Sequence, residues 1–167
     1  MVTKPLNIFL FFCFWLFSAG EVLGMRDIMI APCASGDYIS IDSLYEYCKT
    51  VENCGKKIAC EDQSVLIMGY IDYGNVFDKT NYPSLPYQKF LMTNSDRSQS
   101  IEVWVDCECS EAVFDRLFRQ QTLDSGQVAY VRGTLAGFDM PVMGHCHRGF
   151  KINLIDGNSL SFNADCN

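Results

Sequence analysis

The feature that most constrains this chain is an apolar run at residues 65–71, VLIMGYI, with Gly69 inside it. The run has too many consecutive apolar residues to face water on one side, so both of its faces must be covered near its start. A glycine inside such a strand marks the bend that a small closed sheet needs. The run therefore predicts the central strand of a compact, mainly β structure.

More strands are expected after this run. Residues 73–86 have no periodicity and contain Gly74, Pro83 and Pro86, so they predict a loop that is either a lid on the core or part of a recognition surface. Residues 88–93 and 100–106 flank the turn sequence NSDRSQ and predict a hairpin. A long strand over 128–138 and a closing hairpin of 150–155 and 160–162 complete the set.

The second strand of the NSDRSQ hairpin has one apolar and one polar face. Apolar residues at positions 101, 103 and 105 alternate with Glu102, Trp104 and Asp106. Alternation of this kind directs the two sets to opposite faces of a sheet. Trp104 is therefore expected on an accessible sheet face, unless the N-terminal helix covers it.

Two helices are expected. Residues 40–50 place Leu44, Tyr47 and Cys48 on one helical face behind Ser40 or Asp42 as the cap residue. Residues 110–121 begin with Ser110 as the N-cap and carry a buried stripe made of Val113, Phe114, Leu117 and Phe118. This second helix follows the third of the main predicted strands.

Residues 1–24 predict a secretory signal peptide, because Lys4 precedes an apolar core at residues 6–17 and small residues follow that core. Cleavage after residue 20 or after residue 24 fits the pattern. An uncleaved anchor is the alternative, but the apolar core has 12 residues and a spanning helix needs about 20. We therefore expect an exported chain, periplasmic or extracellular, without a membrane span after signal removal.

Residues 25–167 then form a single domain, which is long enough to bury a core. With Lys4 removed, 20 acidic residues face 12 basic ones, so the mature charge is about −8. A charge of this sign repels a polyanion over the whole surface, and the sequence accordingly disfavours nucleic acid as a partner. The sequence does not fix the oligomeric state.

Eight cysteines remain in the exported chain, and an even number indicates disulfide bonds. Connectivity is not readable, although Cys54 and Cys60 can close a short loop. Cys107 and Cys109 are too close in sequence to favour each other, so each is expected to pair elsewhere, with Cys146 as one partner open to either. The disulfide cysteines are predicted to be Cys33, Cys48, Cys54, Cys60, Cys107, Cys109, Cys146 and Cys166.

The order of these elements resembles that of the OB-fold, a five-stranded Greek-key barrel with a helix between its third and fourth strands. The resemblance covers residues 55–162. The SIDSLYEY helix followed by GKKI and VLIMGYID is also similar to the start of small exported bacterial OB-fold proteins. The resemblance implies a mainly β, five- to six-stranded OB-fold-like barrel, stapled by disulfides, with an extra N-terminal helix.

The resemblance further implies a binding module, since OB-folds bind oligonucleotides, oligosaccharides or proteins on the faces of strands two and three and in the flanking loops. Acidic residues stand where a nucleic-acid binder would need a basic track, so a protein, a glycan or a small ligand is expected. Carried onto this chain, the binding positions are a loop at 140–148 and six aromatic residues, Tyr73, Phe77, Tyr82, Tyr87, Phe90 and Trp104.

The alternative function is copper or zinc binding by the same segment. Thioether sulfur beside imidazole suits copper(I), and the segment contains Met140, Met143, His145 and His147. The two histidines with Cys107 and Cys109 would instead make a four-ligand zinc site. Disulfide pairing and solvated histidines explain these residues without a metal, so no cofactor is expected under the main interpretation.

Catalytic signatures are missing from the sequence, which contains no Gly-x-Ser-x-Gly, no phosphate loop and no His-Glu-x-x-His. Cys107 and Cys109 are conceivable as a redox dithiol. However, Asp106, Glu108 and Glu111 would raise the pKa of their thiols. We therefore expect a binding protein without enzyme activity.

Overall fold

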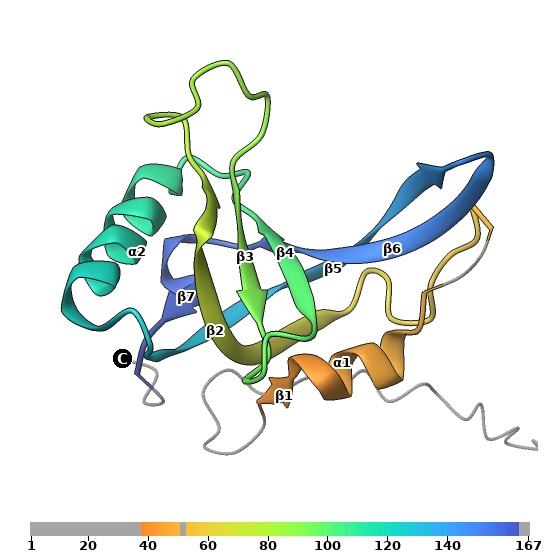
Figure 1. Ribbon diagram of the computed structural model, residues 1–167, viewed down its shortest axis with the longest axis horizontal. Helices are drawn as coiled ribbons and strands as arrows, with labels where there is room; N and C mark the ends of the chain where they lie inside the picture. Colours follow the sequence, from red (N-terminus) through yellow and green to blue (C-terminus); the bar gives the residue numbers. More distant parts are fainter. Residues whose placement is uncertain (1–37, 51–52, 164–167) are drawn as a thin grey trace, which may run out of the picture.

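The computed structural model describes residues 38–50 and 53–163 of the 167-residue chain (Figure 1). The predicted signal peptide lies outside the described residues, as do Cys33 and Cys166. Within the described ranges, no helix is both long enough and apolar enough to cross a membrane.

These residues form one seven-stranded sheet and two α-helices. In chain order the elements are β1 (Ile39–Ser40), α1 (Ile41–Cys48), β2 (Ser64–Phe77), β3 (Lys89–Thr93), β4 (Ser100–Trp104), α2 (Ser110–Asp124), β5 (Val128–Val142), β6 (His145–Leu154), the 3-10 turn η1 (Gly157–Ser159) and β7 (Leu160–Ser161). The mainly β class and both helices are confirmed. The strand count exceeds the predicted five to six, because the two-residue strands β1 and β7 extend the sheet at its ends.

The strands are paired in a partial ring. Their order is β1-β2-β3-β4-β6-β5-β7, and β2 also pairs with β5. The pairings therefore lead from β2 through β3, β4, β6 and β5 back to β2. Neighbouring strands are antiparallel except for β1 with β2 and β4 with β6. The parallel contact between β4 and β6 is short, with Val103 opposite Ile152 and Trp104 opposite Asn153.

The inward side of this ring is the core. Alternating residues of β3 and β4 illustrate it, since Phe90, Met92, Ile101 and Val103 are each at most 2% exposed. The residues that alternate with them along the two strands, such as Lys89 and Glu102, stand on the outer face. The period of two thus separates core from surface on both strands.

Gly69 marks the place where α1 packs on β2. A Cβ at this position would lie 2.7 Å from Ile41 Cδ1 and 2.7 Å from the Thr93 carbonyl oxygen. No side chain fits there, so the glycine lets the buried face of the helix approach the strand. The helix begins as predicted, with the Ser40 hydroxyl accepting a hydrogen bond from the Ser43 N–H at 3.1 Å.

β2 is longer than predicted, because it continues to Phe77 through residues that the sequence analysis assigned to a loop. Its pairing with β3 shifts register between Asp72 and Val76, which indicates a bulge. The Asp72 carboxylate holds this bulge by accepting hydrogen bonds from the Gly74 N–H at 3.1 Å and from Asn75 Nδ2 at 2.7 Å. A bulged strand loses its simple alternation, and the prediction of a loop from residue 73 was therefore wrong.

α2 lies beside β7, at the left of Figure 1. Its N-cap is Cys109, not Ser110 as predicted, and no side chain makes a capping hydrogen bond there. The predicted stripe is confirmed at Val113, Phe114 and Leu117, which are buried. The guanidinium of Arg116 fastens the helix to the end of the chain by donating to the Gly157 carbonyl oxygen at 3.0 Å.

β5 and β6 form a long hairpin that extends away from α2, to the right in Figure 1. The predicted hairpin of 150–155 with 160–162 was wrong, because β6 and β7 both pair with β5. The turn of the observed hairpin is Met143 and Gly144, with φ values of 48° and 84°. A two-residue turn of this type needs positive φ at both positions. Methionine seldom adopts such a φ, so residues 140–148 look like a loop in the sequence.

Candidate functional site

The outer surface of β3 and β4 carries a cluster of aromatic rings and lysines. Phe77 is paired with Lys89, and Lys89 with Trp104, so the three side chains form one cross-strand row. Residues of the 78–88 connection and of β6 complete the cluster. We call it the aromatic–lysine face; it consists of Phe77, Tyr82, Tyr87, Lys89, Glu102, Trp104 and Lys151.

The rings of this face are arranged in two pairs. The centroids of Phe77 and Tyr82 are 5.3 Å apart, and those of Tyr87 and Trp104 are 5.2 Å apart. Both separations are typical of favourable aromatic contacts. Tyr82 is 44% exposed, and the other three rings are partly exposed. The pairs therefore present aromatic surface to solvent.

Two ammonium groups lie against the rings. Lys89 Nζ is 5.2 Å from the Tyr87 centroid and 5.9 Å from the Trp104 centroid. Lys151 Nζ is 3.1 Å from the Trp104 centroid. Cations at such positions are attracted by the negative faces of the rings. Trp104 thus has a lysine from β6 over its face and Tyr87 beside it.

Glu102 fixes the position of two members of the face. Its Oε1 accepts a hydrogen bond from Lys89 Nζ at 2.5 Å, and its Oε2 accepts one from Trp104 Nε1 at 2.7 Å. Burial works to raise the pKa of the Glu102 carboxyl, but hydrogen bonds from Lys89 and Trp104 outweigh it and lower the pKa. The carboxylate therefore stays ionised at neutral pH and restrains both donors.

Lys151 differs from Lys89 in its partners. Within the described ranges, no carboxylate lies at ion-pair distance from Lys151, whereas Lys89 is paired with Glu102. Burial lowers the pKa of Lys151, and the nearby Glu102 charge works in the opposite direction. The ammonium of Lys151 is therefore available to an anionic group of a ligand.

Two of the six aromatic residues predicted for the binding surface lie elsewhere. Phe90 is fully buried, because it alternates with Lys89 along β3 and points into the core. Tyr73 packs against the core, and its pKa is raised by burial and by the charge of Asp124 at the end of α2. The structure brings together the other four, Phe77, Tyr82, Tyr87 and Trp104.

The sequence analysis placed Glu102 on the same face as Trp104 but assigned none of the three charged members to the binding surface. The alternation that predicts an outward Trp104 also predicts outward Lys89 and Glu102, so a signal for these two existed. The sequence contains no comparable signal that places Lys151 on this face. Its place beside Trp104 depends on the parallel contact between β4 and β6, which joins residues far apart in sequence.

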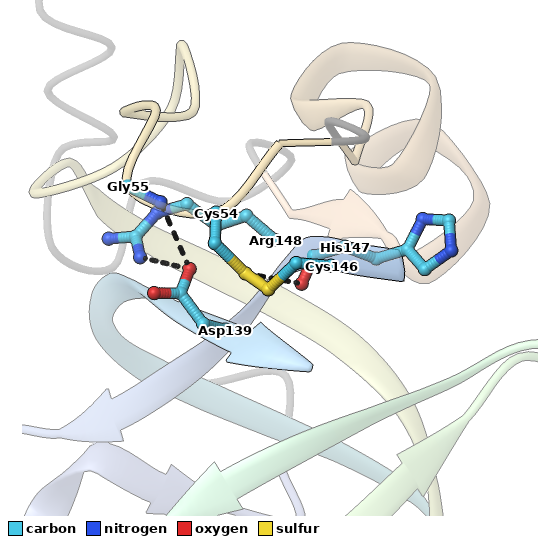
Figure 2. Close-up of a disulfide and its surroundings, with 6 residues drawn as sticks. All are labelled: Cys54, Gly55, Asp139, Cys146, His147 and Arg148. Atoms are coloured by element: carbon cyan, nitrogen blue, oxygen red, sulfur yellow. Dashed lines mark hydrogen bonds and ion pairs between the residues drawn. A yellow bond between two sulfur atoms is a disulfide. The ribbon is translucent and has the colours of Figure 1, made fainter. Parts of the chain in front are cut away.

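The tip of the β5–β6 hairpin is a separate region, shown in Figure 2. A disulfide between Cys54 and Cys146 ties β6 to the segment that precedes β2. Arg148 Nη1 donates to Asp139 Oδ1 at 2.8 Å, and the Gly55 N–H donates to the same oxygen at 3.4 Å. The His147 ring points away from this network in Figure 2.

The disulfides correct two expectations from the sequence. The described residues contain the pairs Cys48–Cys60, Cys54–Cys146 and Cys107–Cys109. Cys60 pairs with Cys48 at the end of α1, where their Cα atoms are 5.3 Å apart, and not with Cys54. Cys107 and Cys109 do pair with each other, since the chain turns there and brings their Cα atoms to 5.0 Å.

The predicted metal ligands now stand on a hairpin instead of a loop. Met143 occupies the turn and is 98% exposed. The sulfur atoms of Cys107, Cys109 and Cys146 are in disulfides. In the part of the chain that the structure describes, no group of three or more His, Cys, Asp or Glu side chains is placed to hold a metal ion. Copper or zinc binding through Met140, Met143, His145 and His147 stays a prediction.

Comparison with known proteins finds likeness among solved structures and none among family models or curated proteins. No family model matches the chain, and no curated protein matches it. A solved structure that it resembles is the mitochondrial single-stranded DNA binding protein Rim1 from S. cerevisiae. The identity is 14% and the TM-score 0.37, over 61% of this chain and 94% of that chain. What Rim1 binds is a property of Rim1 and is not transferred to this chain.

The expectation that nucleic acid is disfavoured as a partner is corrected here. One of the solved structures that resemble this chain is that of a single-stranded DNA binding protein. The expectation also rested on the charge of the whole chain, whereas Lys151 lies over the Trp104 ring without a carboxylate at ion-pair distance among the described residues. The local potential at a face, and not the net charge alone, decides which ligands it attracts. The exclusion of nucleic acid is therefore withdrawn.

Proposed function

We propose that the chain is an exported, non-enzymatic binding module whose ligand lies on the aromatic–lysine face. The observation that carries this proposal is the arrangement around Trp104. Its ring has Lys151 Nζ at 3.1 Å from the centroid, and its Nε1 is held by Glu102. A partly exposed tryptophan that is fixed in advance loses little conformational freedom when a ligand covers it.

We also propose that the fold is an OB-fold barrel with additions. The pairing order β2-β3-β4-β6-β5-β2, with α2 between β4 and β5, agrees with a five-stranded Greek-key barrel that has its helix after the third strand. β1, α1 and β7 are then additions to the barrel. On this interpretation β3 and β4 are the second and third strands, whose outer surface is the aromatic–lysine face.

The chemistry of the face defines the class of ligand. Exposed rings favour a flat, weakly polar surface on the ligand, as in a sugar ring or an aromatic group. The available ammonium of Lys151 favours a negative charge beside that surface. An acidic glycan, a small aromatic acid, an acidic segment of a protein with an aromatic residue, and a single-stranded nucleic acid with its flat bases and negative phosphates all meet both conditions.

Binding without turnover is proposed because the carboxylate of the face is a weak base. The oxygens of Glu102 accept hydrogen bonds from Lys89 and from Trp104. Although burial works to raise it, these hydrogen bonds lower the pKa of Glu102, and an efficient general base has a pKa near the working pH. Glu102 therefore acts in this proposal as a structural member of the face and not as a base for a bound ligand.

The test is a fluorescence titration that uses Trp104 as the reporter. The probes are an acidic oligosaccharide, an aromatic acid, an acidic aromatic peptide and single-stranded DNA. For at least one of these probes we expect a saturable change that weakens by about tenfold in Lys151→Ala, which corresponds to the loss of one charged contact of about 1.4 kcal/mol. Lys56→Ala is the matched control, because Lys56 is exposed and lies outside the face.

Binding that is equal in Lys151→Ala and in the wild type would contradict the proposed site. The probe that gives the strongest Lys151-dependent response identifies the ligand class. A silent Trp104 with every probe would contradict both.

A further inference from the structure

The disulfide Cys107–Cys109 immediately precedes α2, which begins at Ser110. Its cysteines are partly exposed, whereas Cys48 and Cys60 are at most 1% exposed. The two residues are separated by 2 positions in sequence, compared with 12 for Cys48–Cys60 and 92 for Cys54–Cys146. A disulfide restricts the unfolded chain less when the loop that it closes is shorter. Reduction of Cys107–Cys109 therefore costs the fold least.

The helix provides a reason for Cys109 to exist as a thiolate. Cys109 is the N-cap of α2, and no side chain makes a capping hydrogen bond there. The first N–H groups of a helix have no intrahelical partner and carry partial positive charge. A sulfur anion at this position is stabilised by these groups, and cysteines at helix N-termini have lowered pKa values for that reason. Asp106, Glu108 and Glu111 oppose the effect, but all three are exposed and their charges are screened.

Space for a partner lies beside the disulfide. Ser110 and Glu111 line a cleft of about 520 Å³ between α2 and residues 78–81. Gly157 covers a different side of Cys109, since a Cβ on that glycine would be 3.3 Å from Cys109 Cβ. The lining of the cleft includes Ser110, the residue that follows Cys109, so a chain bound in the cleft lies next to the disulfide.

We propose that Cys107–Cys109 is a thiol–disulfide exchange site that oxidises the dithiol of a partner protein, a function beyond ligand binding at the aromatic–lysine face. A partner thiolate attacks Cys107 Sγ, because the leaving sulfur is then Cys109, the one at the helix N-terminus. The Cys107–Cys109 bond breaks as a mixed disulfide forms between the partner and Cys107.

The second partner thiolate completes the reaction. It attacks the partner's own sulfur in the mixed disulfide, so the bond to Cys107 breaks and a disulfide forms within the partner. Two electrons and two protons pass in total from the partner dithiol to Cys107 and Cys109. No other oxidant is needed for this single turnover.

The first test uses glutathione buffers of increasing reducing strength, followed by alkylation and peptide mass mapping. We expect Cys107 and Cys109 to be alkylated at a reduced-to-oxidised ratio about tenfold or more below that needed for Cys54 and Cys146. Trapped glutathione is expected on Cys107. Simultaneous reduction of both disulfides, or earlier reduction of Cys54–Cys146, would overturn the proposal.

The second test compares the two single variants. In Cys107→Ser the remaining Cys109 thiol is expected to react with iodoacetamide at pH 6 about tenfold faster than the Cys107 thiol in Cys109→Ser. The wild type is expected to oxidise one equivalent of a dithiol peptide, and the double serine variant none. Equal alkylation rates would refute the role of the helix, and an unreactive wild type would refute the site.

Discussion

Arg148 and Lys151 lie three residues apart on β6, yet the fold uses their charges in different ways. Arg148 is bound to two carboxylates, with Nη2 at 2.6 Å from Glu61 and Nη1 at 2.8 Å from Asp139. Lys151 lies over Trp104, with no carboxylate at ion-pair distance among the described residues. The charge of Arg148 is thus neutralised by carboxylates of the fold, whereas the charge of Lys151 is the one that the proposed function assigns to a ligand.

The surroundings of the two cations agree with this division. Hydrogen bonds from Arg148 lower the pKa values of both Glu61 and Asp139. The nearby Cys54–Cys146 disulfide fastens the same end of the hairpin (Figure 2). Around Lys151 there are rings that remain partly exposed. The comparison teaches that positive charge marks a binding surface only where no structural anion neutralises it.

The largest expected effect is the loss of stability when the Cys54–Cys146 disulfide, here called the hairpin clamp, is removed. Replacing Cys54 and Cys146 by serine releases a constraint between residues 92 apart in sequence. The chain-entropy relation gives a loss of about 4 to 5 kcal/mol in the free energy of unfolding. The matched double variant at Cys107 and Cys109 is expected to lose about 1.5 kcal/mol by the same relation. Urea unfolding measures both, and equal losses would contradict the assignment of Cys54–Cys146 as the clamp.

The next effect separates two aromatic residues that the sequence assigned to one surface. Phe90→Ala is expected to cost about 3 to 5 kcal/mol, because the ring is fully buried. Tyr82→Ala is expected to cost about 1 kcal/mol or less, because the residue is 44% exposed and lies outside the core. Thermal and urea unfolding check these values. Similar costs at the two positions would show that Phe90 is not a core residue.

A smaller effect tests the two cations directly. Arg148→Met leaves two carboxylates without their partner and is expected to cost about 1 to 3 kcal/mol in unfolding free energy. Lys151→Met removes a cation–π contact and is expected to cost about 1 kcal/mol or less. Ligand affinity should show the reverse order, with the loss at Lys151. If Lys151→Met destabilised the fold more than Arg148→Met, the comparison would fail.

The smallest effect is a pH dependence at Glu102. Because the pKa of Glu102 is lowered in the folded state, its contribution to stability is present above the unfolded value, about 4.3, and is lost as pH falls through the lower folded value. Glu102→Gln should therefore lose less stability than the wild type between pH 5 and pH 3, by about 1 kcal/mol or less for this partly exposed group. Melting curves at the two pH values give the difference. An identical acid dependence of variant and wild type would show that the ion pair contributes nothing.

The sequence predicted elements whose determinants are local. The Ser40 cap, the stripe of α2 and the hairpin of β3 and β4 each follow from a repeating pattern or a cap residue within a few positions. The errors occur where distant contacts override such patterns. The bulge at Asp72 and the turn at Met143 are stabilised by pairing with β3 and within the β5–β6 hairpin, and a single segment does not reveal that pairing.

The candidate site shows the same limit. The outward position of Trp104 could be predicted from alternation, but the position of Lys151 over its ring could not, because it depends on the closure of β4 against β6. Cys109 at the N-cap of α2 was missed for a related reason. Ser110 is the better cap by composition, and the turn at Cys107 moves the start of the helix by one residue.

The most direct test of the binding face is the NMR signal of the Trp104 indole N–H, followed while a probe that changes Trp104 fluorescence is added. We predict saturable shifts of this signal and of the amides of Tyr87, Lys89 and Lys151, because the ligand lies on the aromatic–lysine face. The amides of His145 and His147 at the hairpin tip should not move. Saturable shifts at His145 and His147, with an unchanged Trp104 indole signal, would contradict the account and place the binding site at the tip.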